Sequence, residues 1–165
     1  MAYFTKQEAR NYAKIAAASF ESYSSILESI VKSQNHQRQF DVFLSHSIRD
    51  KELVLGIAEF LKQMGKEVYV DWIEDRQLLR SSVTPETAET LRQKMNQSSR
   101  LLYLATDNAS SSKWMPWELG YFDGLKSGKV AILPLVDYSF SPFKGQEYLG
   151  LYPALDKDDL GRFLD

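Results

Sequence analysis

The chain has 165 residues, of which 44% are hydrophobic and 25% charged, a composition typical of one globular domain and not of a disordered chain. Its formal net charge is −2 and it has no dense Lys/Arg stripe, so we expect no nucleic-acid partner. It has no cysteine and only two histidines, His36 and His46, which excludes disulfides, thiolate chemistry and cysteine-based zinc sites and argues against any metal site.

Residues 1–38 are predicted to form an N-terminal helical extension and linker, followed by an α/β domain over 39–165. We expect one long helix over 5–35, because Thr5 and Glu8 have the spacing of a capping box. Behind this start lies an apolar seam at heptad spacing, formed by Ala9, Ala13, Ala16, Phe20, Tyr23, Leu27 and Ile30. Two interpretations stay open: the seam packs on its own domain, or it is a surface for self-association.

Membrane insertion and secretion are not expected from the sequence. No stretch approaches the roughly 18 consecutive apolar residues of a membrane span. The N-terminus lacks a basic start followed by an apolar run and a small-residue cleavage site, so no signal peptide is predicted. We therefore expect a cytoplasmic location and no membrane partner.

From Phe40 onward, short apolar runs alternate with amphipathic stretches. The apolar runs predict strands over 41–45, 67–71, 100–105 and 129–135, with a short edge strand over 148–151. The amphipathic stretches predict helices over 51–64, 84–97, 114–126 and 157–164. This alternation predicts an α/β, flavodoxin-like fold: a parallel five-stranded sheet of order 2-1-3-4-5 with helices on both faces, plus the N-terminal helix.

The predicted topology indicates where a ligand site would lie. In open α/β sheets, ligands bind beyond the carboxyl ends of the strands, at the point where the strand order reverses. That point lies between the loops 45–50 and 106–113, and the second loop leads into Trp114 and Glu118, which are four apart and so share a helix face. The candidate loop residues are Ser45, His46, Ser47, Thr106, Ser110 and Ser111.

Each candidate also has an ordinary structural interpretation. A glutamate on a helix is usually only solvated, and Trp114 could simply pack in the core. His46 could contact a phosphate or ribose, or serve only in local hydrogen bonding. Asp107 is interpreted as a turn residue. Asp71, Asp75 and Arg80 could meet a neighbouring subunit, or belong to a solvated loop.

Three segments in order resemble the TIR (Toll/interleukin-1 receptor) domain family. They are FDVFLSHSIRDKE (40–52), VYVDWIEDRQLLR (68–80) and SKWMPWELGYFDG (112–124), the last with the pattern Trp-x-x-x-Glu. The resemblance covers about 40–135 and is strongest to bacterial TIR proteins, including those of Thoeris-type antiphage defence. The N-terminal helix lies outside this pattern.

The resemblance implies an NAD⁺ glycohydrolase or cyclase that cleaves the nicotinamide–ribose bond, giving ADP-ribose or a cyclic isomer as an immune signal. By position, Glu118 is the catalytic carboxylate and Trp114 lines the same pocket, with substrate contacts from Ser45, His46, Ser47, Thr106 and Ser111. The resemblance also implies a BB loop over 72–83, whose region supplies the interface residues Asp71, Trp72, Asp75 and Arg80.

NAD⁺ is expected as a substrate and not as a bound cofactor, because no Gly-x-Gly-x-x-Gly follows the first strand. The expected partners are a second copy of the chain, through TIR–TIR contacts, and a separate effector protein that reads the product. Two alternatives stay open. One is a non-catalytic TIR scaffold that acts by self-association. The other is a nucleoside deoxyribosyltransferase-like enzyme, which the segment ELGYFDGLKSGKVAI (118–132) also resembles.

Overall fold

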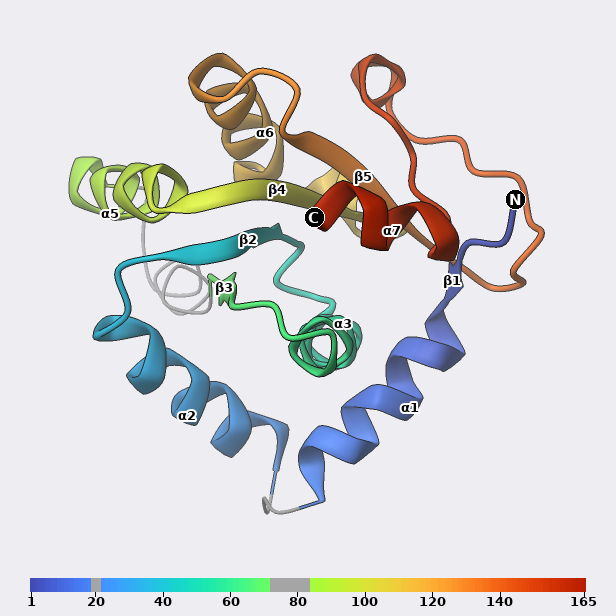
Figure 1. The fold of residues 1–165 in the computed structure, drawn as a ribbon, viewed down its shortest axis with the longest axis horizontal. Helices are drawn as coiled ribbons and strands as arrows, with labels where there is room; N and C mark the ends of the chain where they lie inside the picture. The colour runs from blue at the N-terminus through green and yellow to red at the C-terminus, as the bar shows by residue number, and fades with distance from the viewer. Residues whose placement is uncertain (19–21, 72–83) are drawn as a thin grey trace.

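The computed structural model describes residues 1–18, 22–71 and 84–165, except for the side chains of residues 23, 24, 27 and 31. The described residues form a five-stranded, wholly parallel sheet with the strand order β1-β5-β4-β2-β3 (Figure 1). The strands are β1 (Phe4–Thr5), β2 (Phe40–Ser45), β3 (Val68–Val70), β4 (Ser98–Ala105) and β5 (Val130–Val136). Because all strands run the same way, their carboxyl ends lie along one edge of the sheet.

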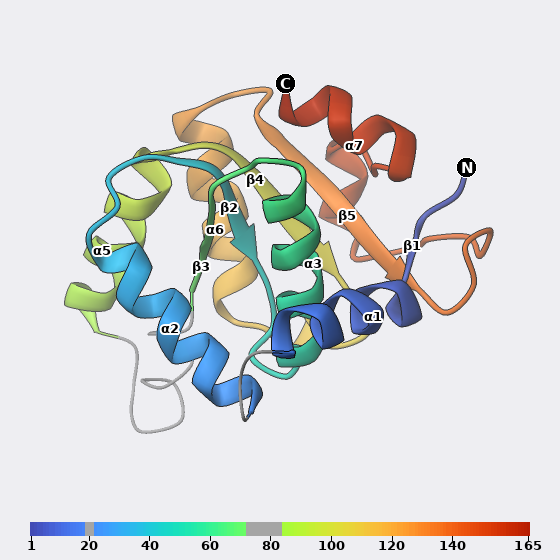
Figure 2. The same ribbon diagram turned by 60° about the horizontal axis from the view of Figure 1, so that its bottom comes forward.

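Helices cover both faces of the sheet, as Figure 2 shows from a second direction. One face carries α1 (Lys6–Ala17), α2 (Tyr23–Asn35), α3 (Lys51–Gln63) and α7 (Lys157–Leu164). The other carries α5 (Pro85–Asn96), α6 (Trp114–Leu125) and the 3₁₀ helix η2 (Glu147–Leu151). None of the helices in the described ranges is long and apolar enough to cross a membrane.

Each face of the sheet has its own hydrophobic core, because successive side chains of a strand point to opposite faces. On β4, Leu102 and Leu104 pack in the core shared with α3, whereas Leu101 and Tyr103 pack in the core shared with α6. The predicted parallel sheet with helices on both faces is therefore confirmed. The order of its first four predicted strands, now β3-β2-β4-β5, is confirmed as well.

The prediction of a fifth strand over 148–151 is wrong, because these residues lie in η2 (Glu147–Leu151). Beyond η2, Ala154 forms a single isolated β-bridge with Ile132 of β5. The preceding residue, Pro153, has no N–H with which to extend this bridge into a strand. The edge position is taken by β1, in which Phe4 pairs with Leu135. Phe4 is only 3% exposed, and burial of its aromatic ring stabilises a strand of just two residues.

The prediction of one continuous helix over 5–35 is also wrong, since the segment contains two helices, α1 and α2. Figure 1 shows them below α3, inclined to each other in a V. The expected capping box is present: the Thr5 amide donates to Glu8 Oε2 at 2.8 Å, and the Glu8 amide donates to Thr5 Oγ1 at 3.1 Å. Ser22 starts the second helix in an extended conformation and accepts a hydrogen bond from the Ser25 amide. An N-cap needs non-helical backbone angles, so the helix cannot run through Ser22.

The first part of the predicted apolar seam packs on its own domain. Ala9 and Ala13 are fully buried against α3. The approach is close because Gly56 on α3 has no side chain; an added Cβ would lie 1.7 Å from the Ala9 carbonyl oxygen. Phe20 lies outside the described residues, as do the side chains of Tyr23 and Leu27. The division at residue 38 remains a prediction.

Candidate functional site

The register between β2 and β4 sets the floor of the candidate site. Ser45, the last residue of β2, is the Cα partner of Tyr103 on β4. Ser45 lies two residues after Phe43, which packs with Tyr103 in the core below α6, so Ser45 shares that face of the sheet. The hydroxyl groups of Ser45 and Tyr103 therefore belong to the α6 side, at or near the carboxyl edge.

Helix α6 brings the candidate carboxylate to this edge. The helix begins at Trp114, where Ser112 Oγ accepts a hydrogen bond from the Met115 amide. Pro116 falls in the first turn, where its missing N–H has no helical acceptor to lose. The buried positions form one stripe: Trp114, Met115, Glu118, Leu119 and Phe122. Trp114 and Glu118 thus share one face of the helix, as their spacing predicts, and this face is buried.

Glu118 is buried to 3% exposure and its Oε1 accepts a hydrogen bond of 2.8 Å from the Ser45 hydroxyl. A carboxyl group at this depth needs polar partners to offset its lost hydration. Tyr103 faces the same region, and its hydroxyl lies 3.4 Å from that of Tyr148. Burial raises the pKa of Tyr103 strongly, and the nearby Glu118 charge adds to the effect, so the phenol stays protonated at neutral pH.

His46 and Ser47 follow Ser45 and are also buried. The His46 Nδ1 lies 3.1 Å from the Ser47 carbonyl oxygen, and Ser47 Oγ accepts from the Arg49 amide at 3.3 Å. Burial lowers the pKa of His46, against opposing contributions from the Ser47 carbonyl and the charge of Asp71. The imidazole is therefore neutral at pH 7.

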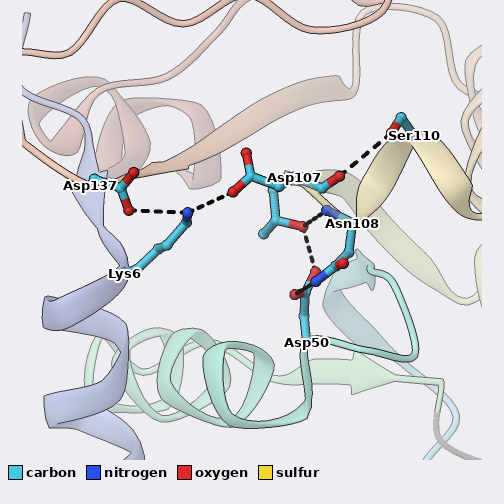
Figure 3. A network of polar contacts seen from close by, with 7 residues as sticks. Lys6, Asp50, Asp107, Asn108, Ser110 and Asp137 are labelled. Carbon is cyan, nitrogen blue, oxygen red and sulfur yellow. Dashed lines mark hydrogen bonds and ion pairs between the residues drawn. The ribbon is translucent and has the colours of Figure 1, made fainter.

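A polar network joins the loops after β2 and β4, drawn in Figure 3. The buried carboxylate of Asp50 accepts hydrogen bonds from the Thr106 hydroxyl and from Asn108 Nδ2, the latter at 2.7 Å. The Thr106 hydroxyl also accepts from the Asn108 amide at 3.2 Å. Because Asp50 immediately precedes α3, the network fixes the start of that helix to the loop that leads to α6.

The N-terminal extension reaches the same edge through Lys6, the first residue of α1. Its Nζ lies 2.8 Å from Asp107 Oδ2 and 3.1 Å from Asp137 Oδ1, so one cation joins the loops after β4 and β5 (Figure 3). These ion pairs raise the pKa of Lys6, with the Asp107 hydrogen bond as the largest cause. A cavity of about 580 Å³ opens beside Lys6, between these two loops.

The indole of Trp114 is buried, and its ring packs edge-on against Trp117 with centroids 5.1 Å apart. Its Nε1 makes no hydrogen bond within the part of the chain that the structure describes. A buried donor without an acceptor is costly, and in native proteins it often indicates a group that a ligand or water completes. The Trp114 N–H is therefore a candidate contact for a ligand or an ordered water.

The structure thus brings together six of the residues selected from sequence: Ser45, His46, Ser47, Asp71, Trp114 and Glu118 are all buried at or near the carboxyl edge. Thr106 is half-buried, and its hydroxyl hydrogen is directed to Asp50. Ser110 and Ser111 are exposed on the short helix η1 (Ala109–Ser111). Trp72, Asp75 and Arg80 lie outside the described residues.

Three residues that contribute to this edge were not selected from the sequence: Asp50, Tyr103 and Asn108. Asp50 and Asn108 stand in the two loops that the topology singles out, so loop position was an available signal. Tyr103 sits inside an apolar strand and resembles an ordinary core residue. Among the residues described, no group of three or more His, Cys, Asp or Glu side chains could hold a metal ion.

Comparisons with known proteins agree with this geometry. Residues 42–162 match the family model described as "TIR domain". Over 138 residues the chain is 47% identical to "Probable 3′ cyclic ADP-D-ribose synthase ThsB′" of Bacillus cereus (strain MSX-D12), covering 83% of this chain and 71% of that protein. Over 94 residues it is 31% identical to "Putative cyclic ADP-D-ribose synthase TIR2" of Cytobacillus dafuensis, covering 55% of this chain and 25% of that protein.

Among solved structures, the crystal structure of the TIR domain of the Toll-related receptor TRR-2 from Hydra magnipapillata is similar. The match has a TM-score of 0.51 at 20% sequence identity and covers 74% of this chain and 88% of that one. At this identity the likeness concerns the fold alone.

Proposed function

The chain belongs to the TIR domain family, and we propose that it is an enzyme that cleaves the nicotinamide–ribose bond of NAD⁺, with Glu118 as the essential carboxylate. The observation that carries the proposal is the buried pair of Ser45 and Glu118 at the carboxyl edge, where the strand order reverses. Support also comes from two relatives, at 47% and 31% identity, that are named cyclic ADP-D-ribose synthases.

The proposed reaction needs little acid catalysis. Nicotinamide is cationic in NAD⁺ and leaves as a neutral molecule when both electrons of the glycosidic bond go to the pyridine nitrogen. The ribose carbon left behind resembles an oxocarbenium ion. A carboxylate beside the ribose stabilises that cation, as carboxylates do in glycoside hydrolysis, and holds the ribose hydroxyls. This is the role proposed for Glu118.

The other buried groups are assigned supporting roles. Ser45 orients the Glu118 carboxylate by donating to one of its oxygens. Trp114 offers its unpartnered Nε1–H to a substrate acceptor and its ring to an apolar surface. His46, Ser47, Thr106 and Ser111 are proposed to contact the substrate from the loops after β2 and β4. The segment 72–83, with Trp72, Asp75 and Arg80, is proposed to meet a neighbouring subunit, whereas Asp71 is buried within this one.

The nucleophile that attacks the ribose cation decides the product. Water gives ADP-ribose, a ring nitrogen of adenine gives cyclic ADP-ribose, and a ribose hydroxyl gives a glycocyclic isomer. Water and the ribose hydroxyl each release one proton to the solution, whereas an adenine ring nitrogen attacks through its lone pair and the positive charge passes to the alkylated adenine. We favour the ribose hydroxyl, because the relative at 47% identity carries 3′ cyclic ADP-D-ribose in its name.

The proposal extends to partners and location. We propose that the chain self-associates through TIR–TIR contacts and that its product is an antiphage signal, read by a separate effector protein. NAD⁺ is consumed as a substrate and is not a resident cofactor. The proposed location is the cytoplasm, where NAD⁺ is present as a substrate.

The test is a reaction of the purified protein with NAD⁺ over a range of protein concentrations. Chromatography measures nicotinamide release, and a mass spectrum separates cyclic from hydrolysed products, since cyclisation lacks the added water. Glu118→Gln keeps the size of the side chain and removes its charge, so we expect a loss of at least about 100-fold. Glu86→Gln, at an exposed position of α5, is the matched control and keeps full activity. Equal release by wild type and Glu118→Gln would refute the assignment.

A further inference from the structure

The end of α2 makes a specific contact with the outer edge of the sheet. Gln34 is buried to 4% exposure, although it lies in the N-terminal extension. Its Oε1 accepts from the Val70 amide at 2.7 Å, and its Nε2 donates to the Val70 carbonyl oxygen at 2.9 Å. Among the described residues β3 is the edge strand on this side, so the amide of one side chain supplies the pair of hydrogen bonds that a further strand would make.

Val70 is close to the candidate site through the sheet ladder. It is the last residue of β3 and the Cα partner of Leu44 on β2. Leu44 directly precedes Ser45, which donates to Glu118. On the other side, Val70 precedes Asp71, which is buried and whose charge acts on His46. The sheet register and the chain itself therefore both connect Val70 to the residues around Glu118.

We propose that Gln34 is a positioning residue for the site around Glu118: it fixes the carboxyl end of β3, and through it Leu44, Ser45 and Asp71, in the geometry that NAD⁺ cleavage needs. This inference rests on the proposed function. Gln34 lies before residues 42–162, the part that matches the family model. The N-terminal extension thus supplies a support for the site from outside the family's common fold.

A second glutamine on the same segment provides a matched comparison. Gln37 donates through Nε2 to Glu67 Oε2 at 2.8 Å, which places its contact before the amino end of β3. Lys94 donates to the carbonyl oxygens of both Gln34 and Gln37, at 3.3 and 3.4 Å. These backbone contacts survive side-chain substitution, so either variant keeps the end of α2 in place. The two variants therefore differ mainly in which end of β3 they release.

The experiment compares Gln34→Leu and Gln37→Leu as full-length proteins. Gln34→Leu leaves the Val70 N–H and carbonyl without their partners, so we expect kcat for nicotinamide release to fall by about 10- to 100-fold, the range for small misplacements of reacting groups. KM is expected to change less than kcat. Gln37→Leu keeps the kcat of wild type. Gln34→Met keeps the length of the side chain and loses both hydrogen bonds, so a similar fall in kcat is expected even if Gln34→Leu does not fold.

Amide hydrogen exchange provides a readout that does not depend on activity. We expect exchange at Val70 and Asp71 to be faster in the Gln34 variants and unchanged in Gln37→Leu. Wild-type kcat in both Gln34 variants, or an equal loss of kcat in Gln37→Leu, would overturn the inference. A wild-type protein inactive on NAD⁺ would instead remove the proposed function. In that event, unchanged exchange at Val70 and Asp71 in both Gln34 variants would still overturn the positioning role.

Discussion

The Ser45 hydroxyl and the Glu118 carboxylate lie 2.8 Å apart, although 73 residues separate them in the chain. The contact joins the last residue of β2 to the second turn of α6. It is therefore the point at which the sheet orients the proposed catalytic group. The first prediction concerns this pair.

Ser45→Ala is expected to lower kcat/KM by about 10- to 100-fold, because a hydrogen bond to a charged group contributes about 1.5–3 kcal/mol. The control is Ser98→Ala, at a buried serine that donates to the Lys94 carbonyl oxygen at the amino end of β4. That variant should lose about 1 kcal/mol of unfolding free energy and keep full activity. Steady-state kinetics measures kcat/KM of both variants, and urea denaturation measures their free energy of unfolding. Unchanged kcat/KM in Ser45→Ala would show that Glu118 needs no orientation by this hydroxyl.

Trp114→Phe removes the indole N–H and keeps an aromatic ring. If this N–H binds substrate, KM for NAD⁺ should rise about 5- to 10-fold, the value of one neutral hydrogen bond. Trp117→Phe is the comparison, because Trp117 stacks on Tyr121 and lies beside the same ring. We expect its KM to stay near that of wild type. A KM unchanged in Trp114→Phe would reduce Trp114 to a packing residue.

The neutral state of His46 predicts a pH-dependent stability. Burial lowers the pKa of His46 in the folded protein, so the unfolded chain binds a proton more readily, from its ordinary pKa of about 6.5 downward. The stabilisation from this group is complete above that pH. It is lost as the pH falls toward the lowered pKa, by at most about 1.4 kcal/mol per pH unit.

Urea denaturation between pH 7.5 and about pH 5 measures this effect. The free energy of unfolding should fall less steeply with decreasing pH in His46→Gln than in wild type. Equal slopes in the two proteins would mean that His46 titrates alike in the folded and unfolded chains.

Gly56→Ala tests the packing of α1 on α3. The added Cβ would overlap the Ala9 carbonyl, so α1 has to move, and we expect a loss of about 3 kcal/mol or more in unfolding free energy. Gly120→Ala is the matched change on α6, where nothing lies within 4 Å of the new Cβ. That variant should be stabilised by about 0.5–1 kcal/mol. Comparable stability of the two variants would show that α1 leaves α3 at little cost.

The parts of the site that the sequence predicts are those governed by local pattern. Apolar runs place the ends of β2 and β4, and strand order then indicates the loops that meet there. Helical spacing places Trp114 and Glu118 on one face, and the structure adds that both are buried. Glu118 and Ser45 could therefore be assigned to one edge before any contact between them was known.

The parts of the fold and site that the sequence does not predict depend on contacts between distant segments. β1 has two residues and no period to recognise, and its strand state comes from pairing with β5. Asp50 meets Thr106 and Asn108 across more than 50 positions, and Gln34 meets Val70 across 36. The heptad spacing over 5–35 continues through Ser22, so it could not reveal that Ser22 begins a second helix.

The covering of α3 by α1 has a practical consequence for protein engineering. The family match starts at residue 42, inside β2, so trimming the gene there would delete β1, α1 and α2 together. The shortened product would expose an apolar surface containing Val54 and Ile57, and it would leave the β5 edge at Leu135 and Val136 without its partner strand. Such a fragment should precipitate on expression, and anyone grafting this unit into a chimera should carry its first 38 residues along.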